Sequence, residues 1–258
     1  MVNSCLRQID RLRHDGYVVV REFTPADELA KLNEVARSQL AARCAPLEFE
    51  ADLQYPGAPP SHDAPGGGTV RRLLDAYSRD PVLAGWATGT HLREWMEAYF
   101  GEHVLMSRAH HNCLMTKHPL YGSMTGWHRD IRFWSFEREE LVSVWLALGE
   151  ETIHNGALWF VPGSHAMGFD PDCFDGARFF RTDRADNAGI VQMAESPRLE
   201  PGDAVLFHCN TLHSAGRNQS DAVKFSLVYT YHGRSNLARP GTRSAAMPEV
   251  ELRALARP

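Results

Sequence analysis

The sequence predicts a mainly β fold in which helices precede and flank an antiparallel sheet that is closed or folded into a sandwich. Helical spacing of apolar residues is concentrated in the first hundred residues. From residue 104 onward, about eight strand-like segments alternate with turn residues. The chain has 258 residues, of which 43% are hydrophobic, and this suits one large domain with a substantial core.

Apolar residues recur at helical spacing in three segments, which are residues 4–15, 24–42 and 92–100. Thr24 is the expected N-cap of the second helix, because Pro25 follows it and an acidic residue lies three positions after it. Between the first two helices, Tyr17–Val20 has the pattern of a short strand.

The strands predicted in the second half are residues 104–116, 126–134, 141–148, 157–161, 190–199, 204–208 and 223–232. Asn155-Gly156 suits a tight hairpin turn with positive φ, so residues 157–161 are expected to pair back toward 141–148.

Two segments do not read as regular structure. Residues 51–68 hold four Pro and four Gly, which predicts a linker or a mobile flap. Residues 166–189 interleave acidic and aromatic residues, and a segment of this length inside a compact domain indicates a functional loop. We expect this second segment to form part of the active-site entrance.

Composition argues against several classes of protein. The formal charge of −5 leaves no basic footprint for a nucleic acid, and no apolar run reaches membrane-spanning length. The N-terminal residues lack the apolar centre of a signal peptide, and the C-terminal residues are not a peroxisomal address. Five scattered Cys without a Cys-x-x-Cys pattern fit a reducing cytoplasm.

The central motif is Thr125-Gly126-Trp127-His128-Arg129-Asp130. In a β-strand, residues i and i+2 point to the same face, so His128 and Asp130 can reach one point. His213 is the best candidate for a third ligand, although His208 is its rival. Two His and one carboxylate on one face of a metal form the facial triad of non-haem Fe(II) oxygenases.

His110 and His111 are adjacent in a predicted strand. One is therefore expected to point inward and the other outward. Nothing in the sequence pairs either of them with Asp130, so a hydrogen-bonded pocket residue is expected rather than a metal ligand.

Further motifs follow in a particular order, and they are Val142–Leu148, Asn155-Gly156, Val161–His165 and Pro201–Phe207. From about residue 104 to 232, the chain resembles the phytanoyl-CoA dioxygenase family of Fe(II)/2-oxoglutarate oxygenases. The resemblance implies a double-stranded β-helix, or jelly-roll, with the metal in its open mouth. It also implies one oxygenase domain over residues 1–258, with helical support and a flap (1–103), a jelly-roll core (104–232) and a tail (233–258).

The resemblance further implies that His128, Asp130 and His213 hold Fe(II), and it favours His213 over His208. 2-Oxoglutarate would occupy two open metal positions and O2 the last. Its decarboxylation to succinate and CO2 would then drive hydroxylation of a small molecule. Related iron halogenases lack the carboxylate ligand, so Asp130 favours hydroxylation or a related oxidation.

The family usually carries an Arg eleven residues after the second His, where this chain has Lys224. Lysine can neutralise the far carboxylate of 2-oxoglutarate but cannot form a bidentate fork, which leaves Arg217 as an alternative partner. Lys224 could also be an ordinary strand-surface lysine. The other implied contacts to 2-oxoglutarate are Trp145, Cys113, Ala215, Ser226 and Arg72, of which Trp145 could equally be a core aromatic residue.

Two other functional classes compete with the oxygenase. A jelly-roll with two His and one acid could hold Zn²⁺ and act as a hydrolase, or the chain could be an inactive binding module. The substrate is not determined by the sequence. Trp127, Phe133 and Trp134 beside the metal motif indicate an apolar or ring-containing pocket.

Overall fold

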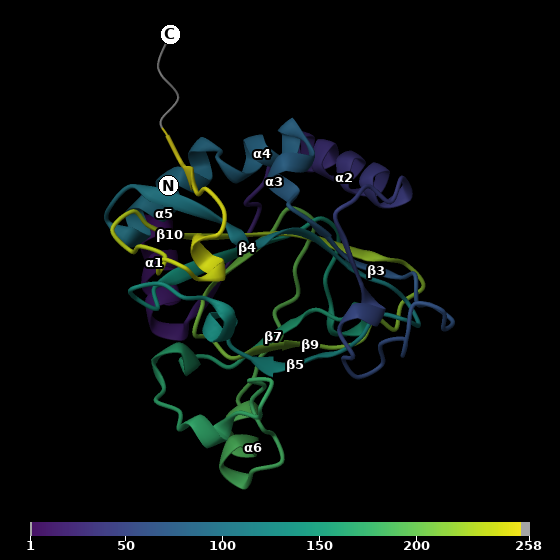
Figure 1. Cartoon of the computed structure of the whole chain (residues 1–258). Helices are drawn as coiled ribbons and strands as arrows, with labels where there is room; N and C mark the ends of the chain where they lie inside the picture. Colours follow the sequence, from purple (N-terminus) through teal and green to yellow (C-terminus); the bar gives the residue numbers. More distant parts are fainter. Residues whose placement is uncertain (1, 254–258) are drawn as a thin grey trace.

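The computed structural model describes residues 2–253 and contains two β-sheets that lie one above the other (Figure 1). The large sheet has eight strands in the order β1-β8-β6-β10-β4-β3-β2, with β11 also paired to β4. The small sheet has the order β5-β9-β7. The strands are β1 (Tyr17–Val20), β2 (Leu47–Phe49), β3 (Val70–Leu74), β4 (Val104–Lys117), β5 (Thr125–His128), β6 (Leu141–Ala147), β7 (Leu158–Phe160), β8 (Ala204–His208), β9 (His213–Ala215), β10 (Lys224–Gly233) and β11 (Val250–Glu251).

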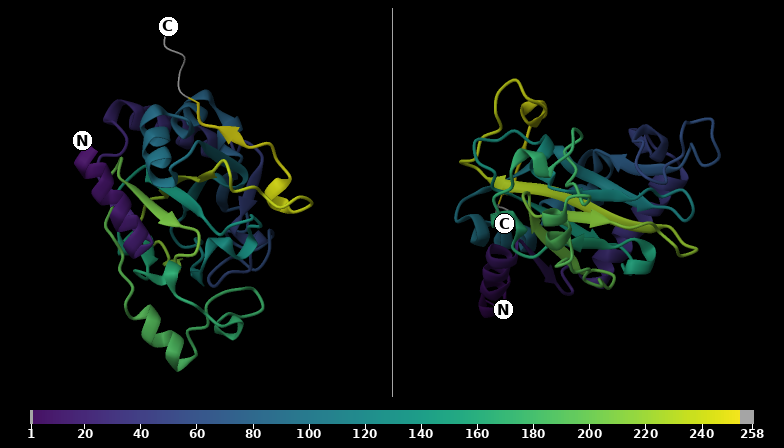
Figure 2. Two further views of the ribbon diagram at one scale, coloured as in Figure 1. Left: turned by 90° about the vertical axis from the view of Figure 1, so that its left-hand side faces the viewer. Right: turned by 90° about the horizontal axis from the view of Figure 1, so that it is seen from below.

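Helices cover the outer face of the large sheet, and one further helix projects beyond the small sheet (Figures 1 and 2). The α-helices are α1 (Val2–Asp15), α2 (Ala26–Ala41), α3 (Ala76–Arg79), α4 (Pro81–Ala87), α5 (Thr90–Phe100) and α6 (Ala185–Val191). The result is a mainly β jelly-roll with flanking helices, which confirms the predicted fold class.

Strand alternation creates two cores. Along β6, Val142, Val144 and Leu146 face the helices and belong to the outer core. Trp145 and Ala147, which lie between and after them, face the small sheet and belong to the inner core. Because both faces of the large sheet are covered, its central strands are apolar on both sides. The functional cavity lies on the inner face.

The helix predictions agree with α1, α2 and α5, and β1 occupies the predicted residues Tyr17–Val20. The predicted N-cap was wrong, because α2 is capped by Pro25 without a side-chain hydrogen bond. The Thr24 hydroxyl instead accepts a hydrogen bond from the buried indole of Trp86 on α4, at 2.9 Å. The Thr24 hydroxyl therefore bonds to Trp86, a residue distant in sequence, rather than to the first turn of the helix.

Several strand predictions were also wrong. β7 pairs with β9 in the small sheet rather than with β6, so Asn155-Gly156 is not a hairpin turn. These residues instead end the 3₁₀ turn Ile153–Asn155, although Gly156 does have the expected positive φ of 79°. Residues 190–199 are not a strand, because α6 runs to Val191 and only isolated bridges follow. The segments β2, β3 and β9 were not predicted as strands, since such short strands carry little periodicity.

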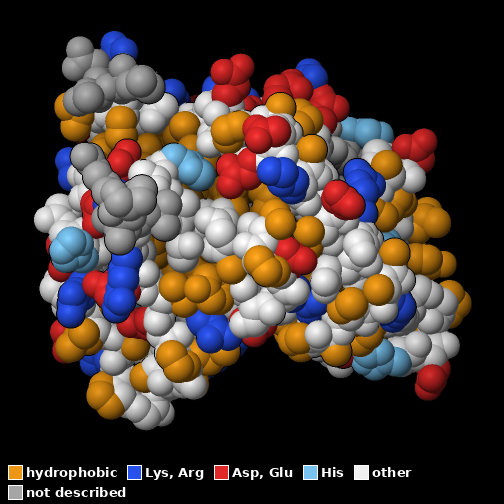
Figure 3. Space-filling model, turned by 90° about the horizontal axis from the view of Figure 1, so that it is seen from above, with side chains coloured by type: hydrophobic (Ala, Val, Ile, Leu, Met, Phe, Trp, Pro, Cys, Tyr) orange, Lys and Arg blue, Asp and Glu red, His pale blue; other side chains and the backbone are white. Residues whose placement is uncertain are grey.

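The helix face of the molecule is chemically mixed (Figure 3). Lys and Arg side chains are interspersed there with Asp and Glu, and neither sign forms a continuous patch on the part of this face that the structure describes. No helix within residues 2–253 combines the length and apolar character needed to cross a bilayer.

Candidate active site

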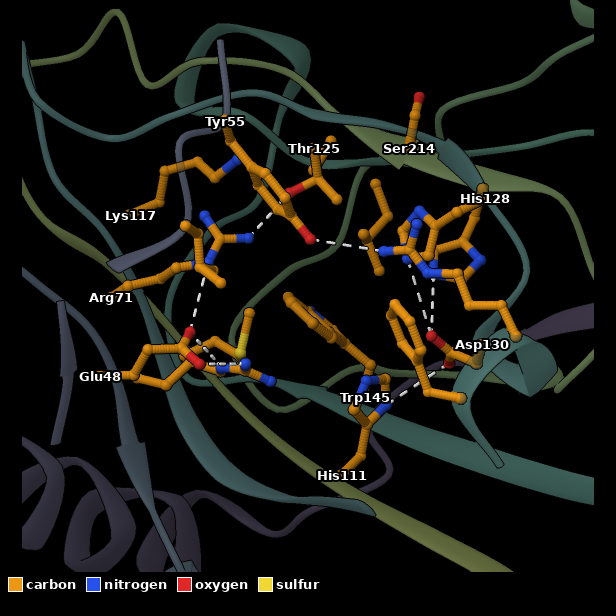
Figure 4. Close-up of a pocket in the computed structure, with 18 of the residues that line it drawn as sticks. Glu48, Tyr55, Arg71, His111, Lys117, Thr125, His128, Asp130, Trp145 and Ser214 are labelled. Carbon is orange, nitrogen blue, oxygen red and sulfur yellow. Dashed lines mark hydrogen bonds and ion pairs between the residues drawn. The ribbon is translucent and has the colours of Figure 1, made fainter. Parts of the chain in front are cut away.

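A cavity of about 480 Å³ lies between the two sheets and contains the predicted metal motif (Figure 4). Strands of both sheets contribute to its wall, from β3 and β4 on one side to β5 and β9 on the other. The polar lining is cationic at one end and carries the histidine–aspartate cluster at the other.

His128 and His213 lie directly opposite each other on adjacent strands. β5 pairs antiparallel with β9, and these two residues are register partners. Directly opposed residues point to the same face of a sheet, so the imidazoles approach with ring centroids 4.1 Å apart. Strand pairing thus joins two residues that are far apart in the sequence.

Asp130 completes the cluster from a different element. The predicted strand 126–134 ends at His128, and Asp130 begins a 3₁₀ helix that runs to Phe133. Its Oδ1 atom lies 3.7 Å from His128 Nε2 and 3.5 Å from His213 Nε2. One donor atom from each residue lies within 4.8 Å of the others, and all three residues are buried.

Backbone carbonyls fix the orientation of both imidazoles. His128 Nδ1 lies 2.8 Å from Gly126 O, and His213 Nδ1 lies 2.9 Å from Thr211 O. A carbonyl can only accept, so each Nδ1 carries the proton and each Nε2 presents a lone pair to the cluster. Burial, followed by the proximity of His213, holds the pKa of His128 well below its usual range. This donor set fits a divalent metal that is bound by imidazole and carboxylate.

The alternation expected for His110 and His111 was wrong. The register of β4 with β10 shifts between Tyr229 and Thr230, and the residues from Arg108 to His111 lie outside the paired positions. In such a bulge, neighbouring side chains no longer alternate, and both histidines line the cavity. His111 Nδ1 lies 3.5 Å from Asp130 Oδ2, a contact that the sequence did not indicate.

The predicted contacts to 2-oxoglutarate lie in different places. Those that line the cavity are Arg72, Trp145, Ala215 and Lys224. Cys113 packs into the inner core, and the Ser226 hydroxyl donates to Glu151 at 2.5 Å. Arg217 is exposed and donates to the carbonyl of Leu120.

His208 and the aromatic residues beside the motif differ in whether they reach the cavity. The His208 ring lies 5.4 Å from that of His165, and its Nδ1 accepts from the backbone of Asn210. Trp127 packs against the Val161–Phe180–Leu212 core cluster, whereas Phe133 and Trp134 line the cavity.

Lys224 is held in a buried ion pair with Glu151, whose Oε2 atom lies 2.7 Å from its amine. Glu151 Oε1 accepts from the Trp145 indole at 2.9 Å and from Ser226. Glu151 was not singled out in the sequence, because the second of two adjacent Glu residues before a turn carries no local signal of burial. Lys117 was also missed, although it ends β4 two residues after the cavity-lining Met115.

The two irregular segments meet at the mouth of the cavity. Tyr55, from the Pro/Gly-rich segment, packs edge-on against Phe179, from the segment 166–189, with ring centroids 5.4 Å apart. The Arg132 guanidinium lies 4.2 Å from the Phe179 ring centroid. The second segment is not wholly irregular, since it contains a 3₁₀ turn at Pro171–Cys173 and most of α6.

Fold and site together define a jelly-roll protein with a buried cluster of two histidines and one carboxylate in its cavity. A profile of the phytanoyl-CoA dioxygenase family matches residues 12–226, and the chain belongs to this family. The predicted class, an Fe(II)- and 2-oxoglutarate-dependent dioxygenase, is thereby confirmed.

The relatives include oxygenases with different substrates. The ectoine dioxygenase of Sphingopyxis alaskensis is 26% identical over 246 residues, which cover 89% of this chain and 76% of that protein. The peroxisomal phytanoyl-CoA dioxygenase of Homo sapiens is 22% identical over 230 residues, with 85% and 65% of the two chains covered.

Solved structures share the fold over most of the chain. The epimerase SnoN, solved with Fe3+, alpha ketoglutarate and nogalamycin RO, has a TM-score of 0.74 at 25% identity and covers 93% of this chain and 88% of its own. EctD from S. alaskensis, solved with 2-oxoglutarate and 5-hydroxyectoine, has a TM-score of 0.76 at 23% identity, with coverage of 98% and 87%.

Proposed function

We propose that this dioxygenase hydroxylates a small molecule and that His128, Asp130 and His213 are its iron ligands. The observation that carries the assignment is the convergence of three buried donor atoms within 4.8 Å of one another. With both Nδ1 atoms engaged by backbone carbonyls, the chain offers two neutral imidazole nitrogens and one carboxylate on one side of a metal, as non-haem Fe(II) oxygenases do.

Bound iron and 2-oxoglutarate would supply, with O2, an oxidant that inserts one oxygen atom into a substrate C–H bond while the second oxygen atom leaves in succinate beside CO2. The residues of this chain position and shield that chemistry. Ser143 holds Asp130 through a 3.3 Å hydrogen bond, and Trp145 closes one wall of the cavity. Cosubstrate contacts by Arg72, Trp145 and Ala215 remain part of this proposal, as do the predicted roles of Cys113 and Ser226.

The assignment is tested by anaerobic titration with Fe(II) and then with 2-oxoglutarate, in the parent and in His128→Ala. The parent is expected to develop the weak visible metal-to-ligand charge-transfer band of a chelated 2-oxo acid, and the variant is not. Iron binding without a band in the parent would contradict the proposal and favour the metal hydrolase or binding-module alternatives.

We further propose that the substrate carries a ring or apolar body and an anionic group. Phe133, Trp134 and Phe179 line the mouth of the cavity together with Arg132 and Arg243. Among residues 2–253, no carboxylate lies within 4 Å of the Arg132 guanidinium, which rests on aromatic faces instead. An arginine in that state favours a substrate carboxylate or phosphate.

Matched pairs of ring-containing acids and their neutral amides test this substrate class. The acids are expected to stimulate succinate release more than their amides do. Arg132→Met should remove the difference, because it deletes the charge while keeping a long apolar side chain. Equal stimulation by acid and amide in the parent would contradict the anionic requirement.

The domain organisation and location are proposed on separate grounds. We propose one oxygenase domain over residues 1–258, since β1 pairs with β8 and thereby joins the N-terminal segment to the jelly-roll. We propose a cytoplasmic location, because all five cysteines are free thiols. If the chain is one domain, a fragment that starts at residue 104 is expected to be insoluble. Finding the native protein in a periplasmic or extracellular fraction would contradict the cytoplasmic location.

A further inference from the structure

The C-terminal segment, residues 234–246, forms part of the cavity wall, although the sequence did not connect it with the site. The buried Ser244 hydroxyl accepts a hydrogen bond from the backbone N–H of Ser135 at 2.8 Å and lies 2.8 Å from His110 Nε2. The backbone N–H of Arg239 donates to Ser135 O at 2.9 Å. These contacts hold the backbone on both sides of Arg243, whose side chain lines the cavity.

Arg243 has no partner among the residues that the structure describes. Within residues 2–253, no carboxylate oxygen lies within 4 Å of its guanidinium, and no hydrogen bond joins its side chain to another residue. Burial, followed by the proximity of His111 and Arg243, lowers the pKa of His110 to about 3, so this imidazole is neutral at ordinary pH. Arg243 therefore supplies positive charge on the side of the cavity where His110 lies.

Arg132 supplies positive charge from a different segment of the wall. It belongs to the 3₁₀ helix Asp130–Phe133, which follows β5. Its guanidinium lies 3.4 Å from the Tyr55 hydroxyl and 4.2 Å from the centroid of the Phe179 ring. The two arginines thus come from elements that are far apart in the sequence and have different surroundings in the same cavity.

The other charges of the cavity cancel when Fe(II) and 2-oxoglutarate are bound. Three cations have carboxylate partners, and the pairs are Arg71–Glu50, Arg72–Glu48 and Lys224–Glu151. The divalent iron and the protonated amine of Lys117 together balance the carboxylate of Asp130 and the two carboxylates of 2-oxoglutarate. The charged residues left over in the lining are Arg132 and Arg243, so the cavity keeps two positive charges in excess. A cleft with such an excess attracts anions.

We propose that Arg243 is a specificity-determining residue that binds a second anionic group of the substrate, so that dianionic ring compounds are preferred over monoanionic ones. The inference deepens the proposed function and rests on it, since Arg132 receives the first anionic group there. The planar fork of guanidinium donors matches a carboxylate or a phosphate. Trp134, which lines the cavity and stacks on His110 with ring centroids 4.8 Å apart, supplies an aromatic surface for the ring of such a substrate.

The test measures the binding of simple aromatic probes to the protein loaded with Fe(II) and saturating 2-oxoglutarate. The probes are benzamide, benzoate and the three benzenedicarboxylate isomers, which place the second carboxylate at three different spacings. Dissociation constants are determined by calorimetry without oxygen, in the parent and in Arg243→Met. Arg234→Met is the matched control, because Arg234 is an exposed arginine of the same segment that pairs with Glu251 and does not line the cavity.

The parent is expected to bind at least one dicarboxylate about fivefold more tightly than benzoate, which is the upper end for an ion pair open to solvent. Arg243→Met should abolish this advantage, because it deletes the charge and keeps a long apolar side chain. Its affinity for benzoate should stay near the parent value, since Arg132 is unchanged, and this shows that the fold and the loaded site are intact. Arg234→Met should keep the advantage of the dicarboxylate.

The contrary outcomes act at different levels. If no dicarboxylate binds the parent more tightly than benzoate, or if Arg243→Met keeps the advantage, Arg243 is an ordinary solvated arginine and the inference is overturned while the proposed function stands. Equal affinity of the parent for benzamide and benzoate would overturn the anionic substrate class and this inference with it. Failure of the parent to bind 2-oxoglutarate would overturn the proposed iron chemistry itself.

Discussion

At the scale of single residues, each candidate metal ligand is oriented by a contact that its other polar atom makes with the protein. His128 and His213 each donate an Nδ1–H hydrogen bond to a backbone carbonyl. The Oδ2 atom of Asp130 contacts Ser143 and His111. Such outer contacts hold the ligand atoms in position before a metal arrives.

Ser143→Ala is therefore expected to weaken Fe(II) binding by about 10-fold, because contacts of this kind are typically worth 10- to 100-fold in metal affinity. The affinity is measured by competition with a chelator under anaerobic conditions. Ser107→Ala is the matched control, since Ser107 is buried in the same sheet and its hydroxyl makes no hydrogen bond. Equal losses in the two variants would show that Ser143 acts through packing alone.

The pH dependence of cosubstrate binding also belongs to this scale. Lys117 lines the cavity as a cation that a carboxylate of 2-oxoglutarate can reach. Burial, followed by the neighbouring Lys224 and Arg71, lowers its pKa to about 7, against the opposing effect of Glu50 and Glu151. Below pH 7, the amine is already charged and affinity for 2-oxoglutarate should be flat. Above pH 7, binding must take up a proton, so affinity should fall by up to about tenfold per pH unit. Calorimetry across pH 6 to 9 checks this. A parallel decline for 2-oxovalerate, which has the same chain length but no distal carboxylate, would exclude Lys117 as its source.

At the scale of elements, the site depends on irregularities rather than on regular strands. The end of β5 turns Asp130 toward its two histidines, and the bulge in β4 brings His111 beside Asp130. The mouth depends on two long segments that touch through Tyr55 and Phe179. The regular strands form the scaffold, and the positions where they end or bulge orient the side chains of the site.

Tyr55→Ala should loosen the opposite segment of the mouth. Because Tyr55 is an aromatic partner of Phe179, its loss is expected to speed hydrogen exchange of amides in residues 175–181 while strands β6 and β10 stay protected. Hydrogen-exchange mass spectrometry measures the effect, with Tyr55→Phe as the control that keeps the ring. Unchanged exchange in residues 175–181 would mean that the two segments are ordered independently.

At the scale of the whole molecule, two cores share the large sheet. The outer core fixes the helices on the sheet, and the inner core fixes the small sheet that carries both histidines. The cavity is buried between the sheets, so a ligand that enters it stabilises only the folded state.

Iron is therefore expected to raise the thermal stability of the protein. At 100 times its dissociation constant, Fe(II) should add about 2.7 kcal/mol to the free energy of unfolding. For a chain of this size, that corresponds to a rise in Tm of about 5–11 °C. Anaerobic thermal denaturation with and without a chelator measures the shift. His128→Ala should show little of it, and an equal shift in that variant would point to binding elsewhere.

The sequence by itself determined the fold class and the candidate metal residues. The local signals were the strand-like apolar segments that form β6, β8 and β10 and the His128-x-Asp130 motif. The jelly-roll form and the choice of His213 over His208 came from the family resemblance. It also located the two segments at the mouth through their composition. Periodicity, short motifs and segment composition depend on residues that are adjacent in the chain, so they can be recognised without a structure.

Only the tertiary structure decided which charges in the cavity are already paired. Glu151 meets Lys224, and Glu50 meets Arg71, across sequence separations that no local pattern encodes. The same holds for the pairing of β7 with β9 and for the contact of His111 with Asp130. Electrostatic pairing depends on distance in space, and for this reason these ion pairs emerge only when the strands are assembled.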